Sequence, residues 1–166
     1  MESTNKKFKG GYQMKCISYT TEMQNRLDDF FNTMYSARDL KYEPLGRHND
    51  LRKIPTIYQE DGGNFWVIAS GKKIIGTIGL KILDKENCVG EIKRMAVLPE
   101  YQGKGYGRLL LDNLVDEAIK KSLSKLRLDT MKSYEKALNL YRSTGFYEIE
   151  RYNDNYRAEV YMEKRL

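Results

Sequence analysis

Three glycines within five positions mark the stretch of this sequence best suited to chemistry. Gly103, Gly105 and Gly107 alternate in "VLPEYQGKGYGRLLLDNL", residues 97–114, although the whole chain of 166 residues contains only 13 glycines. Glycine loses more conformational entropy on ordering than any other residue, and it weakens the start of a helix. A tight turn explains one or two of these glycines. Three in alternation predict that a ligand approaches the backbone closely.

The position of this loop favours an anion as the ligand. The loop follows a strand-like segment and precedes a leucine-rich helical pattern, so unpaired backbone N–H groups meet the positive end of a helix dipole. A Walker A loop needs Ser or Thr after its Gly-Lys pair, where this chain has Gly105. A dinucleotide fingerprint starting at Gly103 needs a glycine at the position of Arg108. The pattern that is present is Gln102-x-x-Gly105-x-Gly107.

This pattern resembles the pyrophosphate loop of the GNAT superfamily of acyl-CoA-dependent N-acyltransferases. In that family the loop has the form (Arg/Gln)-x-x-Gly-x-(Gly/Ala) and joins the fourth strand to the third helix. The segment "EIKRMAVLPEYQGKGYGRLLLDNL" is similar to the strand-loop-helix core of the family, and "ALNLYRSTGFYEI" is similar to its later helix-turn-strand. The resemblance covers roughly residues 15–166.

The resemblance implies acetyl-CoA as cosubstrate, and no metal. In the family, backbone N–H groups of the glycine loop bind the pyrophosphate of coenzyme A, and neighbouring basic side chains add positive charge. A bulge in the fourth strand leaves main-chain groups for the pantetheine arm. The residues expected to bind the coenzyme are Met95, Val97, Gln102, Gly103, Lys104, Gly105, Tyr106, Gly107 and Arg108.

Two residues are candidates for the chemistry at the acceptor amine. A lysine-like amine has a pKa of about 10.4 and must lose a proton before it attacks the thioester. Glu91 lies eleven positions before Gln102, where some histone-type members of the family carry their base. The alternatives for Glu91 are an ion pair with Lys93 or Arg94, or a solvated strand end. Tyr141, four residues before a Gly-Phe pair, matches the family tyrosine that protonates the leaving thiolate, and its alternative is a core aromatic.

Acceptor specificity in this family comes from the first helices and the last strand loop, here "SARDLKYEPLGRHNDLRKIP" and "RYNDNYRAEV". Their mixed charges and tyrosines suit a small polar amine, an amino acid or a peptide terminus, and we favour a small molecule. Asp39, Glu43 and His48 lie in the first of these segments, so each could substitute for Glu91 as the base.

One position departs from the family pattern. Many members carry an asparagine seven residues before the tyrosine, where it contacts the coenzyme, and this chain has Tyr134 there. We expect this contact to be absent or to be replaced by Ser133 or Asn139.

The elements that must position these residues follow from periodicity and turn signals. Strands are predicted at 15–19, 65–69, 74–83, 88–98, 125–131, 147–151 and 158–166, and helices after residue 20, after the glycine loop and within 133–145, with a short one from residue 49. This order indicates a mixed α/β domain with an antiparallel run before a βαβ crossover. With the resemblance it predicts a GNAT-like α+β fold, in which about four helices flank a central mixed sheet of seven strands. One domain is expected over 15–166, after a flexible lead-in over 1–14.

The composition limits the class of protein and its partners. With 40% hydrophobic and 31% charged residues the chain fits a soluble globular protein, and no apolar run approaches the ~18 residues of a membrane span. The N-terminus has no apolar core of a signal peptide, so we expect a cytoplasmic protein that does not bind membranes. The net charge of +6 is scattered, which disfavours nucleic acid as a partner. A homodimer remains open, since homodimers are common in the family.

The two cysteines, Cys16 and Cys88, lie 72 positions apart in strand-like segments. We expect buried reduced thiols that act as small hydrophobic side chains, in preference to a disulfide. With one histidine and no CxxC pair, a metal site is not expected either.

Three function classes are compatible with these sequence features. The first is an acetyl-CoA-dependent N-acetyltransferase, which the intact loop together with Tyr141 favours. The second is a GNAT-like sensor or interaction module that binds acyl-CoA but transfers little. The third is a basic nucleic-acid-binding domain, which the spread of the 13 tyrosines over core and loop segments disfavours.

Overall fold

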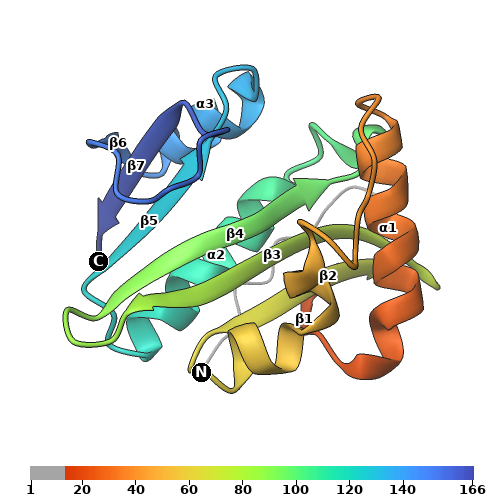
Figure 1. Cartoon of the computed structure of the whole chain (residues 1–166), viewed down its shortest axis with the longest axis horizontal. Helices are drawn as coiled ribbons and strands as arrows, with labels where there is room; N and C mark the ends of the chain where they lie inside the picture. The colour runs from red at the N-terminus through yellow and green to blue at the C-terminus, as the bar shows by residue number, and fades with distance from the viewer. Residues whose placement is uncertain (1–13) are drawn as a thin grey trace.

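A single mixed sheet of seven strands runs through the part of the chain that the computed structural model describes, residues 14–166 (Figure 1). Its strand order is β1-β2-β3-β4-β5-β7-β6. The strands are β1 (Cys16–Ser18), β2 (Asn64–Ser70), β3 (Lys73–Asp84), β4 (Val89–Val97), β5 (Lys125–Thr130), β6 (Tyr147–Glu148) and β7 (Val160–Arg165). The predicted sheet and element order are confirmed. The predicted N-terminal lead-in lies outside the described residues, apart from residue 14.

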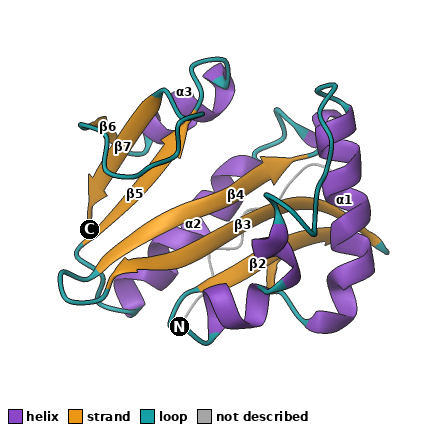
Figure 2. Cartoon of the chain, in the orientation of Figure 1, coloured by secondary structure: helices purple, strands orange, loops and turns teal. Residues whose placement is uncertain are grey.

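Helices cover both faces of this sheet (Figure 2). In Figure 1, α1 (Gln24–Ser36) lies in front of the sheet, and α2 (Tyr106–Lys120) and α3 (Glu135–Ser143) lie behind it. Short helical turns complete the cover: η1 (Thr21–Met23), η2 (Asn49–Arg52), η3 (Pro55–Gln59) and η4 (Pro99–Tyr101). None of the helices over residues 14–166 is long and apolar enough to cross a membrane.

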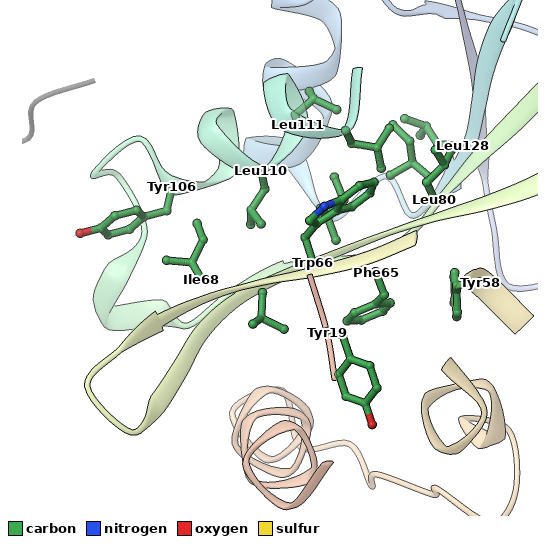
Figure 3. Close-up of a cluster of buried hydrophobic side chains, with 14 of the residues drawn as sticks. Tyr19, Tyr58, Phe65, Trp66, Ile68, Leu80, Tyr106, Leu110, Leu111 and Leu128 are labelled. Atoms are coloured by element: carbon green, nitrogen blue, oxygen red, sulfur yellow. The ribbon is translucent and has the colours of Figure 1, made fainter. Parts of the chain in front are cut away.

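The hydrophobic core occupies both faces of the central strands (Figure 3). Successive strand residues point to opposite faces, and in β2 both faces are buried. Phe65 packs edge-on against Tyr19 and Tyr58 on one face, while Trp66 lies among leucines of α2 on the other. Burial on both faces explains why β2 and β3 appear in the sequence as nearly continuous apolar runs.

Strands β4 and β5 are paired only at one end. Their parallel ladder joins Val89–Glu91 to Lys125–Arg127, although β4 continues to Val97. On its other edge β5 pairs with β7 along its whole length. Beyond the short ladder, β4 and β5 diverge (Figure 1). One backbone edge of the second half of β4 is therefore left without a neighbouring strand.

A bulge sits in this same half of β4. Between the pairs that join Gly79 to Lys93 and Thr77 to Ala96, β4 contains one residue more than β3. Arg94 lies in the bulge with a φ of 53°, and its carbonyl oxygen accepts a 2.8 Å hydrogen bond from the Thr77 hydroxyl. The bulge bends the strand and directs the Arg94 side chain away from the regular alternation.

Arg94 anchors the loop before β2 to the bulge. Its Nε and Nη2 donate to the two carboxylate oxygens of Asp50 at 2.9 and 2.6 Å, and Nη1 donates to the hydroxyl of Tyr35 at 3.2 Å. The Tyr58 hydroxyl also donates to Asp50, at 2.8 Å. Burial alone would raise the pKa of Asp50, but the Arg94 and Tyr58 hydrogen bonds outweigh it and hold that pKa below its ordinary value.

We expect Asp50→Ala to lower the free energy of unfolding by about 3 kcal/mol, because it leaves a buried guanidinium without its partner. Guanidinium chloride denaturation monitored by circular dichroism measures this loss. The matched control is Asp112→Ala, which breaks the exposed Arg108–Asp112 pair and is expected to cost less than about 1 kcal/mol. Equal losses in the two variants would contradict the anchoring role.

The structure corrects several details of the sequence analysis. Strand β6 is two residues long, where five were predicted, since its pairing with β7 covers only Tyr147 and Glu148. Cys88 lies in the turn before β4 with a φ of 55°, and both it and Cys16 are only half-buried. Both cysteines are free, as predicted.

Candidate active site

The glycine loop presents unpaired backbone donors at the start of α2. Gly103 and Gly105 have φ values of 73° and 87°, in the left-handed region that favours glycine. Gly105 is the N-cap residue, just before α2 begins at Tyr106, and no acidic side chain lies in the first helical turn. Within the described chain, the N–H groups of Gly103, Lys104 and Gly105 make no hydrogen bond to another residue. These donors, together with the helix dipole, fit the pyrophosphate of coenzyme A.

Gly107 is required for a different reason. It lies within α2 and its φ is not positive. A Cβ atom at this position would lie 3.3 Å from Leu140 Cδ2 and 3.5 Å from Met95 Cε. The third glycine therefore allows α2 to pack closely against α3 and β4.

The side chains around the loop serve mainly to hold it. The Gln102 amide donates to the carbonyl of Val97 at 3.1 Å, which ties the loop to the end of β4. Arg108 pairs with Asp112 at 2.8 Å, while Lys104 is exposed. The Tyr106 side chain, at the first residue of α2, is buried (Figure 3).

The edge of β4 without a neighbouring strand offers the backbone groups of Met95 and the N–H of Val97, whose carbonyl accepts a hydrogen bond from Gln102. In an antiparallel ladder, alternate residues point both backbone groups at the same neighbour. The N–H of Leu98 donates to the carbonyl of Ile75 in β3, so Leu98 and, two residues earlier, Ala96 face β3. Met95 and Val97 consequently face the opening between β4 and β5, where the sequence analysis places the pantetheine arm.

A cavity of about 480 Å³ opens where β4 and β5 diverge. It extends from the helix α1 side of the sheet to α3, and the loop between β6 and β7 closes another side. Its lining residues are Phe31, Met34, Tyr35, Arg38, Leu40, Arg47, His48, Ile92, Lys93, Arg94, Met95, Ala96, Leu128, Asp129, Thr130, Met131, Tyr134, Ala137, Tyr141, Asn155, Tyr156, Arg157 and Ala158.

Tyr141 lies in the wall of this cavity, on α3. Its hydroxyl donates to the thioether sulfur of Met95 at 3.2 Å, and its ring packs edge-on against Phe146. Burial raises the pKa of Tyr141, and the charge of Asp129 raises it further, so the hydroxyl is protonated at neutral pH. A thioether is a weak acceptor, which leaves this proton available for a stronger one. Tyr141 is therefore buried, as the core-aromatic alternative predicts, and it also lines the cavity, as the proton-donor role requires.

Glu91 is buried behind the cavity and does not line it. Its Oε1 accepts hydrogen bonds from the Tyr152 hydroxyl at 2.8 Å and the Asn153 amide at 3.4 Å, with Lys93 Nζ at 3.8 Å. The same Asn153 amide also donates to Asp129, which does line the cavity. Glu91 is thus connected to the cavity indirectly, through Asn153 and through Lys93, which also lines it.

Asp129, which the sequence analysis did not single out, is the one carboxylate in the cavity lining that the described residues provide. It lies near the end of β5, and its second oxygen accepts a 3.1 Å hydrogen bond from the Asn155 amide. The signal was present in "KLRLDTM", where the alternation sets Asp129 opposite the buried Leu126 and Leu128. A polar residue at the carboxyl end of a strand beside a divergence is a recurrent feature of ligand sites.

The three further candidates of the acceptor segment lie in different environments. Asp39 is exposed and outside the cavity lining, and Glu43 pairs with Arg47 at 3.2 Å. His48 lines the cavity, but its Nδ1 accepts a 2.9 Å hydrogen bond from the backbone N–H of Glu43. The other ring nitrogen of a neutral histidine carries the proton, so His48 has no free lone pair with which to act as a base.

His48 links stability to pH. Burial, reinforced by the charges of Arg94 and Arg47, lowers the pKa of His48 from 6.5 to about 4. Between these values the unfolded chain binds more protons than the folded one, so the free energy of unfolding falls as pH falls. We expect His48→Asn, which keeps an acceptor for Glu43, to reduce the stability lost between pH 7 and pH 5 by about 1–2 kcal/mol. Urea denaturation at both pH values measures this loss of stability. An equal loss in the variant and in the parent would contradict the prediction.

Tyr134 takes part in a contact across the mouth of the cavity. Arg38 Nη1, at the end of α1, donates to the Tyr134 hydroxyl at 3.3 Å, and the guanidinium lies 4.6 Å from the ring centroid. Ser133 and Asn139 are exposed and do not line the cavity. The position that departs from the family pattern is therefore occupied by a side chain that connects α1 to α3.

Comparisons with known proteins show the family to which this fold belongs. The Acetyltransferase (GNAT) family profile matches residues 23–146. The uncharacterized N-acetyltransferase YsnE of Bacillus subtilis is 36% identical over 107 residues, 61% of this chain and 69% of that protein. The ribosomal protein bS18-alanine N-acetyltransferase of Escherichia coli is 36% identical over 85 residues, 51% of this chain and 55% of that protein. A GNAT-family acetyltransferase of Staphylococcus aureus has a TM-score of 0.81 at 25% identity, covering 92% of this chain and 98% of that one.

The chain belongs to the acetyltransferase (GNAT) family. It is, as a member, an acetyl-CoA-dependent acetyltransferase. The PaiA N-acetyltransferase of Thermoplasma acidophilum, solved in complex with coenzyme A, shares the fold with a TM-score of 0.68 at 19% identity and covers 93% of this chain and 100% of its own. Among residues 14–166 no group of three or more His, Cys, Asp or Glu side chains is placed to hold a metal ion.

Proposed function

We propose that this protein transfers an acetyl group from acetyl-CoA directly to the primary amine of a small molecule. The observation that carries the proposal is the position of Met95. Its backbone faces the unpaired edge of β4, its methyl group lies beside Gly107, and its sulfur accepts the Tyr141 hydroxyl. A coenzyme bound along this edge would extend from the loop to the cavity and bring its thioester next to Tyr141.

Coenzyme A, when bound, supplies the activated acetyl thioester. The protein's part is to hold it and to manage protons. The N–H groups at the start of α2 bind the pyrophosphate, as they do other anions at helix N-termini. The backbone groups of Met95 and Val97 pair with the pantetheine amides in the way that a further strand would.

The reaction needs one proton to leave the amine and one to reach the sulfur. The neutral amine attacks the carbonyl carbon, the C–S bond breaks, and Tyr141 donates a proton to the departing sulfur. The nitrogen passes its surplus proton to Asp129, and exchange with solvent returns one proton to Tyr141. Asp129 is placed in the cavity to accept a hydrogen bond from the amine, and Asn153 connects it to Glu91. Glu91, as the base that the sequence analysis proposed, would act through this connection and not by direct contact.

The size of the cavity supports a small acceptor, since about 480 Å³ falls in the range of small-molecule sites. Among the relatives, one is named for acetylating an alanine of a ribosomal protein and one, from Azospirillum brasilense, is named an IAA acetyltransferase. These names do not point to one class of acceptor, so we infer the acceptor class from the site itself. A cytoplasmic location and a homodimer stay predictions.

The test is a thiol-release assay with purified protein, acetyl-CoA and a panel of small primary amines, alongside calorimetric titration with acetyl-CoA. We expect micromolar binding and amine-dependent release of coenzyme A. Binding without release for any amine would favour the sensor alternative. Absence of acetyl-CoA binding would overturn the proposal.

A further inference from the structure

The charges around the cavity do not balance. Its lining contains five cationic side chains and, in the described chain, one carboxylate, that of Asp129. The cationic residues are Arg38, Arg47, Lys93, Arg94 and Arg157. A cavity meant for a simple cationic amine would be expected to carry the opposite excess, because like charges repel the protonated substrate.

Three of these cations are neutralised by carboxylates outside the cavity. Arg94 is paired with Asp50 at 2.6 Å, Arg47 with Glu43 at 3.2 Å, and Lys93 lies 3.8 Å from Glu91. In each case the partner does not line the cavity. These ion pairs stabilise the wall of the cavity, and they leave none of the three cations unpaired for an anionic ligand.

Arg38 and Arg157 are different, because no carboxylate of the described residues pairs with either. Arg38 contacts the ring and hydroxyl of Tyr134, and the Arg157 guanidinium lies 5.7 Å from the Tyr156 ring centroid. Both arginines are exposed, so they lie at the rim. They come from two segments far apart in the sequence, one after α1 and the other in the loop between β6 and β7, and both line the cavity.

Asp129, near the end of β5, is the carboxylate of the cavity lining. Its oxygens are held by the amides of Asn153 and Asn155, and its charge acts on Tyr141. A neutral amide donor holds a carboxylate in place without neutralising it. The site therefore offers one anion beside the reacting atoms and two unpaired guanidinium groups at the entrance.

We propose that the acceptor is a primary amine that also carries a carboxylate, an amino acid in the broad sense. The inference rests on the proposed function and adds the class of substrate. The amine enters first and lies beside Asp129, and the carboxylate stays at the rim between Arg38 and Arg157. A guanidinium binds a carboxylate with two parallel hydrogen bonds, which gives orientation as well as affinity.

The test compares matched pairs of acceptors in the thiol-release assay. Each pair is an amino acid and its carboxamide, taken from the L-α-amino acids and from β-alanine and 4-aminobutyrate. Amidation lowers the pKa of a neighbouring amine and so raises its reactive neutral fraction, which by itself favours the amide. We expect the best amino acid to exceed its amide in kcat/KM by at least about tenfold, the effect of a hydrogen bond between charged groups. The two sets distinguish an α-amine from a more distant one.

Variants then assign the preference to residues. Arg38→Gln combined with Arg157→Gln should raise KM for the amino acid about tenfold and reduce the preference over the amide below about threefold, with KM for acetyl-CoA unchanged. Arg165→Gln removes the same charge at the exposed end of β7, outside the cavity, and should change neither value. A preference that survives in the double variant would overturn the inference.

The two proposals fail in different ways. If the amides react as fast as the amino acids or faster, the acceptor class is wrong and the acetyltransferase remains. If neither set releases thiol but another small primary amine of the panel does, the acceptor class is wrong and the acetyltransferase remains. If no amine of the panel or of either set releases thiol while acetyl-CoA binds, both proposals are overturned.

Discussion

Replacing Tyr141 by phenylalanine is expected to lower kcat by at least about 100-fold while acetyl-CoA binds as before. A positioned acid typically raises the rate of the chemical step by about 10²–10⁴-fold, and this substitution removes only the hydroxyl group. The ring would keep its packing against Phe146, since phenylalanine fills the same space. The lost hydrogen bond goes to a thioether, a weak acceptor, so little stability should change with it.

Steady-state kinetics at saturating acetyl-CoA, with calorimetry for the dissociation constant, measure this effect. The matched control is Tyr147→Phe, which removes a hydroxyl that donates to Glu163 at 2.8 Å, away from the cavity. Its kcat should stay within about twofold of the parent. A Tyr141→Phe variant with nearly full kcat would assign this residue to packing alone.

Gly105→Glu is expected to weaken acetyl-CoA binding by at least about 100-fold. Two effects add. A side chain at a φ of 87° is strained by about 1–2 kcal/mol, which disturbs the loop, and the new carboxylate competes with the pyrophosphate for the same N–H donors. Calorimetric titration with acetyl-CoA measures the dissociation constant directly.

The control for this prediction is Gly71→Glu. Gly71 has a φ of 59° in the turn between β2 and β3, and a Cβ there would meet nothing within 4 Å. The variant therefore carries the same charge change and a similar backbone strain outside the glycine loop, in the turn between β2 and β3. We expect its affinity for acetyl-CoA to remain within about twofold of the parent. Comparable weakening in both variants would show that general destabilisation, not the anion site, causes the loss.

Much of the candidate site could be predicted because its signals are local. The strand, the glycine loop and the helix occupy one continuous segment, and the positive φ values of Gly103 and Gly105 are what glycines at a helix start indicate. Met95 and Val97 were expected from the family resemblance, which implies main-chain contacts between the fourth strand and the coenzyme. The family resemblance added the ligand, which periodicity could not supply.

Other features depended on residues far apart in the sequence. The anchor of the bulge joins Arg94 to Asp50, 44 positions away, and Glu91 is held by Asn153, 62 positions away. Gly107 looked like a third loop glycine, but the side chain of Leu140 is the neighbour that requires it. His48 was a candidate base by residue type, but the backbone N–H of Glu43 occupies the lone pair of its Nδ1.

By itself the sequence determined the elements, their order and the glycine loop, because these follow from patterns within a few residues. Tyr141 was singled out by the family resemblance. Tertiary structure decided which side chains meet. It brought Asp129, Arg38 and Arg157 to one cavity, and it left Glu91 behind the wall. The physical reason is the early separation of β4 from β5, which creates the cavity and is set by pairing between strands, not by either strand alone.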